Sequence, residues 1–335
     1  MTELTDDLTI GVDLGGTKIA VGVVDPKGHV ISRLRVPTPA DPDLILDAIA
    51  DAVHELRYDC YDVRAIGVGA AGYVDEHRST VHFAPNLSWR DKPIRAQLEQ
   101  ATRLPVVVEN DANAAAWGEY VYGAGAGYDH LVMVTLGTGL GGGVISNGQL
   151  FRGRFGMAGE IGHYRAVPGG LPCRCGQDGC IEQYASGDAN SRRAREQAAA
   201  APDRAAALLA LGDGTPAGIA GSHVTAAARA GDPFALDVFE QTGRWVGQVL
   251  ADLTAILDPA VFVIGGGLGE TGELIRRPAE RAYRQALGAG PYRLCADVVT
   301  ATVGADVGLI GAADLARVTA TSTAIRPGKK VTHHG

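Results

Sequence analysis

The pattern of apolar and polar positions at the start of the chain predicts strands joined by a glycine turn. Two apolar runs, residues 8–13 and 19–24, flank the turn at 14–18. Runs of this kind joined by a short turn that contains Gly are typical of a β-hairpin. Apolar residues with helical spacing follow over 43–57, and the run at 64–69 predicts a buried strand.

The next predicted elements are a helix, a strand and a second helix. Residues 91–102 are amphipathic, 105–109 form an apolar run, and an Ala-rich helical segment covers 110–120. Asn110 and Asp111 stand near the start of the second helix, where Asn and Asp are preferred capping residues.

The strand–glycine turn–strand pattern then recurs. Residues 130–136 predict a strand, 137–143 a glycine turn, and 144–146 the beginning of another strand. Asp13 and Thr135 occupy equivalent places in the two copies. Two such halves indicate a duplicated fold with a cleft between them.

The second half of the chain is mainly helical by composition. Residues 156–187 are rich in Gly, Cys and Pro and are predicted to be irregular, whereas 188–256 are Ala-rich and helical in character. A strand over 258–267 ends in glycines and precedes a helix over 270–287. In an α/β fold, such a strand end is a ligand-binding edge, against which an adenine ring would lie.

These patterns give an α/β protein with two domains. We predict a small α/β domain over 1–118, completed by a closing helix near 307–318, and a large α/β domain over 119–306 that contains the loop 156–187. Residues 319–335 have no apolar period and are predicted to form a disordered tail.

Composition and charge exclude several classes of protein. The 335 residues are 46% hydrophobic and 20% charged, which is ordinary for a globular protein and excludes disorder over most of the chain. The net charge of −8 and the absence of a basic block argue against a nucleic-acid partner. The longest apolar stretch, 131–145, is short and broken by glycines, and the N-terminus is acidic, so we expect a cytoplasmic protein without a membrane partner.

The cysteines suggest a metal site. Three of the five cysteines fall within eight positions, which does not suit a secreted disulfide framework. Together with one nearby imidazole they make a tetrahedral zinc set, whose members are His163, Cys173, Cys175 and Cys180. Four protein ligands close the coordination sphere, so the zinc is expected to be structural. The alternative is a set of buried or incidental thiols.

Two carboxylates accompany this cysteine segment. Glu160 precedes His163 by three residues, and Glu182 follows Cys180 by two. Carboxylates beside an imidazole suit hydrogen bonding to vicinal hydroxyls, and His163 can ligate zinc with one ring nitrogen and bind substrate with the other. The alternative for each carboxylate is simple solvent exposure.

The glycine turns are candidate phosphate-binding loops. The segments 11–18 and 137–142 nearly match a P-loop and a dinucleotide fingerprint, but a strand follows each where those motifs require a helix. Glycine hairpins still expose backbone N–H groups to phosphate oxygens, with Thr17, Lys18 and Thr138–Gly139 as donors. The alternative is that these glycines only make turns.

Asp111 is the candidate catalytic residue. Asp111 would accept a hydroxyl proton from a substrate that Asn110 orients. An ordinary carboxylate is a weak base, but phosphoryl transfer has a loose transition state in which positioning does most of the work. The alternative is that both residues only cap a helix.

Four segments together resemble the ROK family of bacterial sugar kinases within the actin-like ATPase superfamily. Residues 13–18 and 136–143 resemble its two phosphate motifs, 109–113 its catalytic segment, and 160–182 its zinc and sugar signature. Residues 265–269 resemble its adenosine motif.

The resemblance implies a duplicated actin-like (ribonuclease H-like) fold of two α/β domains with an active-site cleft between them, ATP with Mg²⁺ as cofactor, and a structural Zn²⁺. It implies sugar contacts at Gly72, Asn110, Asp111, Glu160, His163 and Glu182, with Asp111 as general base. It implies nucleotide contacts at Asp13, Gly15, Gly16, Thr17, Lys18, Thr138, Gly139, Gly265, Gly266 and Gly267. It implies zinc ligands at His163, Cys173, Cys175 and Cys180.

The run 180–187 is similar to the glucose-specific members of the family. This similarity implies an ATP:hexose 6-phosphotransferase that converts D-glucose to glucose 6-phosphate and ADP, and a homodimer or homotetramer. The alternatives are a kinase for mannose, N-acetylglucosamine, N-acetylmannosamine or fructose, or a non-catalytic sugar-sensing regulator. The regulators of the family carry a helix-turn-helix domain, for which we expect no room ahead of Asp13.

Overall fold

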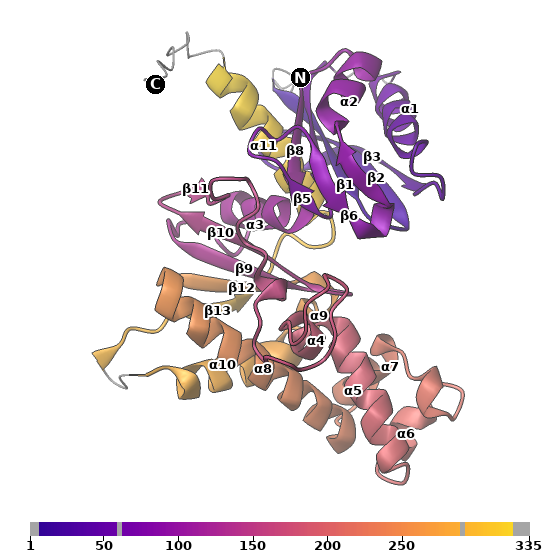
Figure 1. Cartoon of the computed structure of the whole chain (residues 1–335), viewed down its shortest axis with the longest axis vertical. Helices are drawn as coiled ribbons and strands as arrows, with labels where there is room; N and C mark the ends of the chain where they lie inside the picture. The colour runs from indigo at the N-terminus through magenta and orange to yellow at the C-terminus, as the bar shows by residue number, and fades with distance from the viewer. Residues whose placement is uncertain (1–6, 59–61, 289–291, 324–335) are drawn as a thin grey trace. The chain divides into compact units, whose positions relative to one another are not determined.

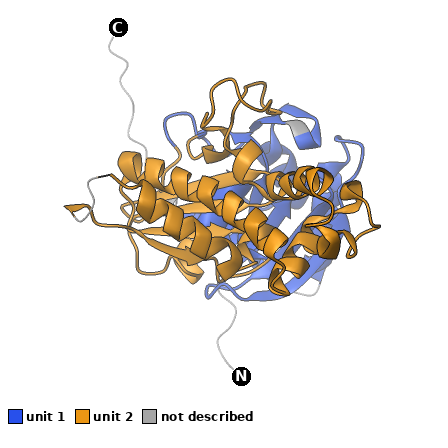
Figure 2. Ribbon diagram, turned by 90° about the horizontal axis from the view of Figure 1, so that it is seen from below, with its two compact units in different colours: residues 1–118, 153–157, 306–335 blue, residues 119–152, 158–305 orange. Residues whose placement is uncertain are grey.

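The chain forms two units, which Figure 2 shows in different colours. The structure is a computed structural model that describes residues 7–58, 62–288 and 292–323. Unit 1 comprises residues 1–118, 153–157 and 306–335, and unit 2 comprises residues 119–152 and 158–305.

Unit 1 contains a five-stranded mixed sheet in the order β3-β2-β1-β4-β8. Its strands are β1 (Leu8–Leu14), β2 (Lys18–Val24), β3 (Val30–Pro37), β4 (Val63–Ala70) and β8 (Val106–Asn110). β1 is antiparallel to β2 and parallel to β4, and β4 is parallel to β8. The hairpin predicted around the first glycine turn is confirmed.

Unit 2 repeats this arrangement in the order β11-β10-β9-β12-β13. Its strands are β9 (Leu131–Leu136), β10 (Leu140–Ser146), β11 (Gln149–Leu150), β12 (Val261–Gly265) and β13 (Asp297–Thr300). β9 is antiparallel to β10 and parallel to β12, as β1 is to β2 and β4 in unit 1. β10 is antiparallel to β11, and β12 is parallel to β13. Asp13 pairs with Gly69 on β4, and Thr135 pairs with Gly265 on β12, so the two residues do occupy equivalent places in a duplicated α/β fold.

A row of glycines lets the last helix lie directly on the sheet of unit 1. Gly11 on β1 pairs with Gly22 on β2 and with Gly67 on β4, beneath α11 (Val307–Thr323) (Figure 1). A Cβ atom on Gly11 or Gly67 would lie 2.0 or 1.8 Å from a carbonyl oxygen of this helix. Because side chains alternate across a strand, the residues on either side of these glycines point to the opposite face.

The opposite face of this sheet carries the apolar core of unit 1. Ile10, Val12, Ile66 and Val68 are buried there together with the apolar side of α1 (Ile45–Tyr58) and with α2 (Ile94–Thr102). The alternation of small and large residues on β1 and β4 therefore separates a face for a closely seated helix from a face for bulky side chains.

Some element boundaries differ from the sequence prediction. The helix expected over 91–102 begins at Ile94, because Pro93 precedes it and residues Trp89–Lys92 form β7 instead. This strand belongs to a small sheet with β5 (Tyr73–Val74) and β6 (Val81–Ala84), and η1 (Pro85–Leu87) links β6 to β7. α11 includes residues 319–323 of the expected tail, and residues 324–335 lie outside the described residues.

The helices of unit 2 follow the Ala-rich part of the sequence. They are α4 (Glu182–Ala185), α5 (Gly187–Ala200), α6 (Ala206–Leu209), α7 (Gly221–Arg229), α8 (Pro233–Leu257), α9 (Gly266–Gly269) and α10 (Glu273–Ala286), with η2 (Ile161–His163) and η3 (Pro216–Gly218) as short 3₁₀ turns. The strand expected over 258–267 ends at Gly265, because the glycines after it form the helical turn α9. Among the described residues, no helix is both long enough and apolar enough to span a membrane.

Candidate functional site

The junction between β8 and α3 (Asp111–Tyr122) in unit 1 carries the predicted sugar contact Asn110 and the predicted general base Asp111. Asn110 is the capping residue, because its Oδ1 accepts a hydrogen bond from the Asn113 N–H at 3.1 Å. Its Nδ2 donates to the Gly72 carbonyl oxygen at 3.1 Å. Gly72 has φ of +123° and lies so close to Phe83 that a Cβ there would be 2.3 Å from the Phe83 carbonyl oxygen. Asn110, Asp111 and Gly72 are thus brought together.

Asp111 is the first residue of α3 and is not needed as its cap. Burial raises the pKa of its carboxyl above the usual value, and the Ala112 N–H, which donates to Oδ1 at 2.9 Å, opposes this shift. A carboxylate with a raised pKa is a stronger base at neutral pH than an ordinary aspartate. The environment therefore suits Asp111 to accepting a proton.

Asp13 lies in the field of Asp111. The pKa of Asp13 is raised to about 6, first by burial and then by the negative charge of Asp111, while the positive charge of Lys18 opposes both. The Asp13 carboxyl also lies beside the first turn of α11, where a Cβ on Gly308 would be 3.5 Å from its Cγ. Two partly buried carboxylates in mutual repulsion form a place where a cation is favoured.

We expect Asp13→Asn to raise the melting temperature of the nucleotide-free protein more at pH 8 than at pH 4.5. The folded pKa of about 6 lies above the ordinary aspartate value of 3.8, so the unfolded chain loses this proton first as pH rises. The stability that the protonated Asp13 carboxyl contributes is therefore fully present below about pH 4 and is lost as the pH rises through about 6. Thermal melts at both pH values test this, with Asp47→Asn on the exposed face of α1 as control. A difference that does not change with pH would contradict it.

The first glycine loop is held by its carbonyl oxygens. The Gly15 N–H donates to the Lys18 carbonyl at 3.1 Å, and Thr38 donates its N–H to the Thr17 carbonyl at 3.1 Å and its hydroxyl to the Gly15 carbonyl at 2.7 Å. Gly16, Thr17 and Lys18 are exposed. The loop is therefore tightly turned and presents its tip outward.

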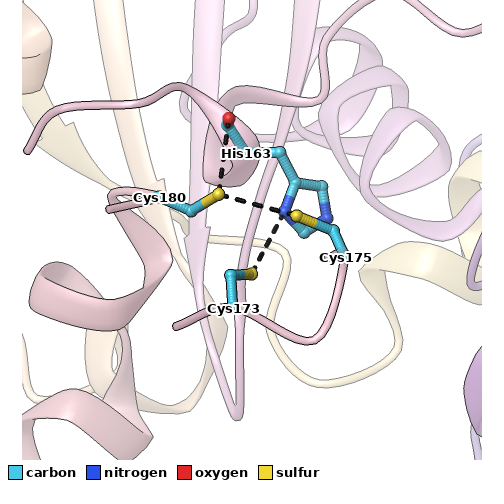
Figure 3. Close-up of side chains that lie close together, drawn as sticks. All are labelled: His163, Cys173, Cys175 and Cys180. Carbon is cyan, nitrogen blue, oxygen red and sulfur yellow. Dashed lines mark hydrogen bonds between the residues drawn. The ribbon is translucent and has the colours of Figure 1, made fainter. Parts of the chain in front are cut away.

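In unit 2, the predicted zinc ligands come together as one cluster, which Figure 3 shows. Their donor atoms all lie within 4.8 Å of one another. The Sγ atoms of Cys175 and Cys180 are 3.6 Å apart, and Cys173 Sγ is 3.7 Å from His163 Nδ1. Zinc with Zn–S bonds of about 2.3 Å and a Zn–N bond of about 2.0 Å would hold tetrahedral ligands roughly 3.5–3.8 Å apart. The donor set and its spacing fit a zinc site.

Glu182 connects this cluster with the second glycine loop. Its Oε1 lies 3.5 Å from Cys173 Sγ, and its Oε2 accepts a hydrogen bond from the Leu140 N–H at 3.2 Å. A Cβ on Gly139 would lie 2.2 Å from the same Oε2, so only glycine leaves room for this carboxylate. Any displacement of Glu182 therefore disturbs both the cluster and the loop.

Glu160 and His163 stand at the two ends of η2, which is pressed against β10. The His163 N–H donates to the Glu160 carbonyl oxygen at 3.1 Å. A Cβ on Gly162 would lie 1.9 Å from the Leu140 carbonyl oxygen, and one on Gly142 would lie 2.4 Å from Ile161 Cδ1. These two glycines let the turn approach the strand, which places Glu160 and His163 near the start of β10.

A hollow of about 780 Å³ opens beside the second glycine loop, within unit 2. Gly137 and Thr138 line it, together with residues at the start of α5, along α7 and around α9, including Gly267. A volume of this size lies in the usual range for a small-molecule site. The hollow brings together Thr138 and Gly267, two of the residues predicted to contact the nucleotide.

Of the five predicted nucleotide contacts in unit 2, three do not line this hollow. Gly139 lies against Glu182, Gly265 belongs to β12, and Gly266 packs on β9, where a Cβ would lie 2.7 Å from the Leu136 nitrogen. The φ of Gly266 is +77°, which a residue with a side chain rarely adopts.

Most of the hollow's polar wall was missed from the sequence. It is supplied by Asp188, Asn190, Ser191, Ser222, Thr225 and Arg229. A signal was available, because Ser222, Thr225 and Arg229 recur at helical spacing in an Ala-rich stretch and so share one face of α7.

The family to which this chain belongs follows from its match to a family model. The model of the ROK family matches residues 9–319. The chain belongs to the ROK family. Its likeness extends to solved ROK structures: a ROK glucokinase from Streptomyces griseus, crystallised with glucose and AMPPNP, has a TM-score of 0.86 and 54% identity, covering 93% of this chain and 99% of that one.

Other proteins that resemble this chain have different activities. The glucokinase of Streptomyces coelicolor is 54% identical over 92% of this chain and 98% of its own length. An N-acetylmannosamine kinase of Escherichia coli is 33% identical, with 92% and 98% covered. A ROK transcriptional regulator homologous to the Escherichia coli MLC protein has a TM-score of 0.82 at 25% identity, but the match covers 93% of this chain and only 78% of the regulator.

Proposed function

We propose that this ROK protein is a glucokinase, which transfers the γ-phosphoryl group of ATP to the 6-hydroxyl of D-glucose. The products are glucose 6-phosphate and ADP. The observation that carries the proposal is the 54% identity, over nearly the whole chain, to Streptomyces glucokinases, of which one was crystallised with glucose and an ATP analogue. A hexose 6-phosphotransferase needs a base for the hydroxyl, a pocket for the nucleotide and polar groups for the sugar.

Unit 1 supplies the base. Asp111 accepts the proton of the 6-hydroxyl as the phosphorus–oxygen bond forms, and the raised pKa of Asp111 favours this step. Asn110 and Gly72 hold the sugar, since the hydrogen bond between them fixes both positions. A loose transition state asks little of the base in strength and much in position.

Each unit, considered by itself, contains residues proposed to contact ATP. The second loop, through Thr138, and the hollow beside it hold the nucleotide in unit 2, with Gly139, Gly265 and Gly266 shaping that wall. In unit 1 the first loop, with the half-buried Gly15 and the exposed Gly16, Thr17 and Lys18, would face phosphate oxygens. Mg²⁺ comes with ATP and neutralises phosphate charge, and the Asp13 carboxylate is the group that would face it.

Unit 2 supplies the remaining sugar contacts and the zinc. The side chains of Glu160, His163 and Glu182 form hydrogen bonds with the sugar hydroxyls. A structural zinc held by His163 and the three clustered cysteines would keep their segment folded, since the donor spacing fits tetrahedral coordination. His163 would bind the metal through Nδ1, which leaves Nε2 for the substrate.

A second candidate is a kinase for another hexose or N-acetylhexosamine, which the 33% identity to an N-acetylmannosamine kinase favours.

The chain would act as a homodimer or homotetramer, as its resemblance to the family implies.

A coupled ADP-release assay with Mg-ATP across hexoses and N-acetylhexosamines tests the proposal. We expect kcat/KM to be highest for glucose, with no turnover when sugar is omitted. Highest kcat/KM for another sugar would replace glucose with that substrate. Measurable sugar binding without any turnover would reject the kinase and favour a sugar sensor.

A further inference from the structure

We propose that the ion pair between the partly buried Arg78 and the buried Glu109 positions the sugar-binding and catalytic segment, with Glu109 as the positioning residue. This inference rests on the proposed function, because it assumes that Asn110 and Asp111 act on a sugar. The sequence singled out residues 109–113 as a motif but assigned no role to Glu109.

Glu109 is buried in β8, directly before the catalytic pair. Its side chain is 1% exposed, and its Oε2 lies 3.0 Å from Arg78 Nε. Its Oε1 accepts hydrogen bonds from the Asn110 N–H at 3.0 Å and from Asn113 Nδ2 at 3.2 Å. One carboxylate therefore holds residues on both sides of Asp111.

Arg78 is itself fixed from several directions. It stands in the turn between β5 and β6 with φ of 56°, and its carbonyl oxygen accepts hydrogen bonds from the Val108 N–H at 3.0 Å and from Arg95 Nη2 at 2.8 Å. Its guanidinium also reaches α11, donating from Nη1 to Thr319 Oγ1 at 3.3 Å. The turn is thus bound to β8 through its backbone and to Glu109 through its side chain.

These contacts form a continuous network that extends to the proposed sugar contacts. Glu109 fixes the backbone of Asn110, while Gly72 and Asn113 fix its side chain at 3.1 Å each. Hydrogen bonds to an ionised carboxylate are stronger and shorter than neutral ones. Removing one member of a buried ion pair leaves the other charge uncompensated, and the local structure must move.

Such a movement would impair the binding and phosphorylation of the sugar more than the binding of ATP. A misplacement of about 1 Å costs roughly 10²-fold in rate when a reaction depends on orientation. The hollow proposed for the nucleotide consists of residues of unit 2, and none of the contacts of Arg78 and Glu109 described above involves the first glycine loop of unit 1. A selective effect on glucose is therefore the signature of a positioning role.

The control is another ion pair of unit 1, in which both side chains are buried. Arg317 Nη1 lies 2.6 Å from Asp314 Oδ1, both side chains are 8% exposed, and Arg317 also donates to Thr9 Oγ1. Neither residue is among the proposed sugar, nucleotide or metal contacts. Loss of this pair should lower stability without a selective kinetic effect.

The test uses the full chain with Glu109→Gln, Arg78→Met, the double variant and Arg78→Lys, beside Asp314→Asn. We expect each of the first two to lower kcat about 10- to 100-fold and to raise the glucose KM. The ATP KM should stay within about twofold, because its proposed pocket is untouched. The double variant should lose less than the product of the single losses, and Arg78→Lys should recover part of the rate because it keeps the charge.

Three further measurements separate positioning from stability and from the proposed function. Melting temperatures should fall for Asp314→Asn without a change in the glucose KM. Glucose affinity by titration calorimetry should weaken for Glu109→Gln, independently of turnover. If wild type neither binds nor phosphorylates glucose, the proposed function fails, and the same titrations are then made with the sugar that wild type does bind.

Two results would overturn the inference. One is a Glu109→Gln enzyme whose kcat and glucose KM lie within about twofold of wild type, because orientation losses are normally larger. The other is a joint change in the glucose and ATP KM values that follows the fall in melting temperature, as expected of a purely structural pair. Should Glu109→Gln fail to fold, the double variant removes both charges at once and decides in its place.

Discussion

Asp111→Asn is expected to lower kcat for glucose phosphorylation by about 10²–10⁴-fold, which is the usual contribution of a general base. Asn keeps the size of the side chain and an oxygen to accept the Ala112 N–H at 2.9 Å, so the start of α3 is preserved. It cannot accept the proton of the sugar hydroxyl. Steady-state kinetics with saturating Mg-ATP measure the loss.

Stability and binding show whether this loss is chemical. Because burial raises the pKa of Asp111, its ionised form is disfavoured in the folded protein, and the neutral Asn variant should melt at the same or a higher temperature at pH 8. Glucose affinity by calorimetry should change only a few-fold. Asp47→Asn, in the first turn of α1, makes the same substitution at an exposed helix start and should leave kcat unchanged. A kcat for Asp111→Asn within tenfold of wild type would remove Asp111 from this role.

The strands and the turns between them were accessible from sequence because local pattern determines them. The hairpin around the first glycine turn and its repeat around the second follow from apolar runs and glycine, and both sheets have the expected α/β character. The boundaries of α2 and α9 were less accessible. Trp89–Lys92 becomes a strand through pairing with β6, and no local signal carries that pairing.

The metal cluster was predictable for a different reason. Three cysteines within eight residues are confined to one loop by chain length alone, so spacing nearly determines their contact. His163 lies ten residues before Cys173. The distance of 3.7 Å between His163 Nδ1 and Cys173 Sγ also depends on the close packing of η2 against β10. That second condition is carried by Gly142 and Gly162, which only the structure explains.

Long-range partners were inaccessible for the same physical reason. Arg78 and Glu109 are 31 positions apart, and nothing in either segment specifies the other until β5, β6 and β8 are placed. The polar face of α7 was readable as a pattern, but the pattern does not say that it lines a hollow beside Thr138. Sequence therefore identified groups that act through their immediate neighbours and missed those that act through the fold.

Cys175→Ser is expected to release zinc and to raise the KM for glucose. The donor atoms of the cluster lie within 4.8 Å of one another, and a serine oxygen is a far poorer zinc ligand than a thiolate. Metal binding of this kind supplies folding free energy to its loop, so loss of the ion should loosen residues around the cluster. Metal analysis should show about one zinc per wild-type chain and a small fraction of that in the variant.

The effect should reach the sugar through Glu182, because this carboxylate lies 3.5 Å from Cys173 Sγ and 3.2 Å from the Leu140 nitrogen. Changes at groups that orient metal ligands commonly cost 10- to 100-fold in activity, and we expect a rise of about that size in the glucose KM. Cys295→Ser replaces an exposed cysteine outside the cluster and should retain both zinc and glucose affinity. A Cys175→Ser protein with full zinc content would reject the metal assignment, and one that loses zinc but keeps its glucose KM would reject the link through Glu182.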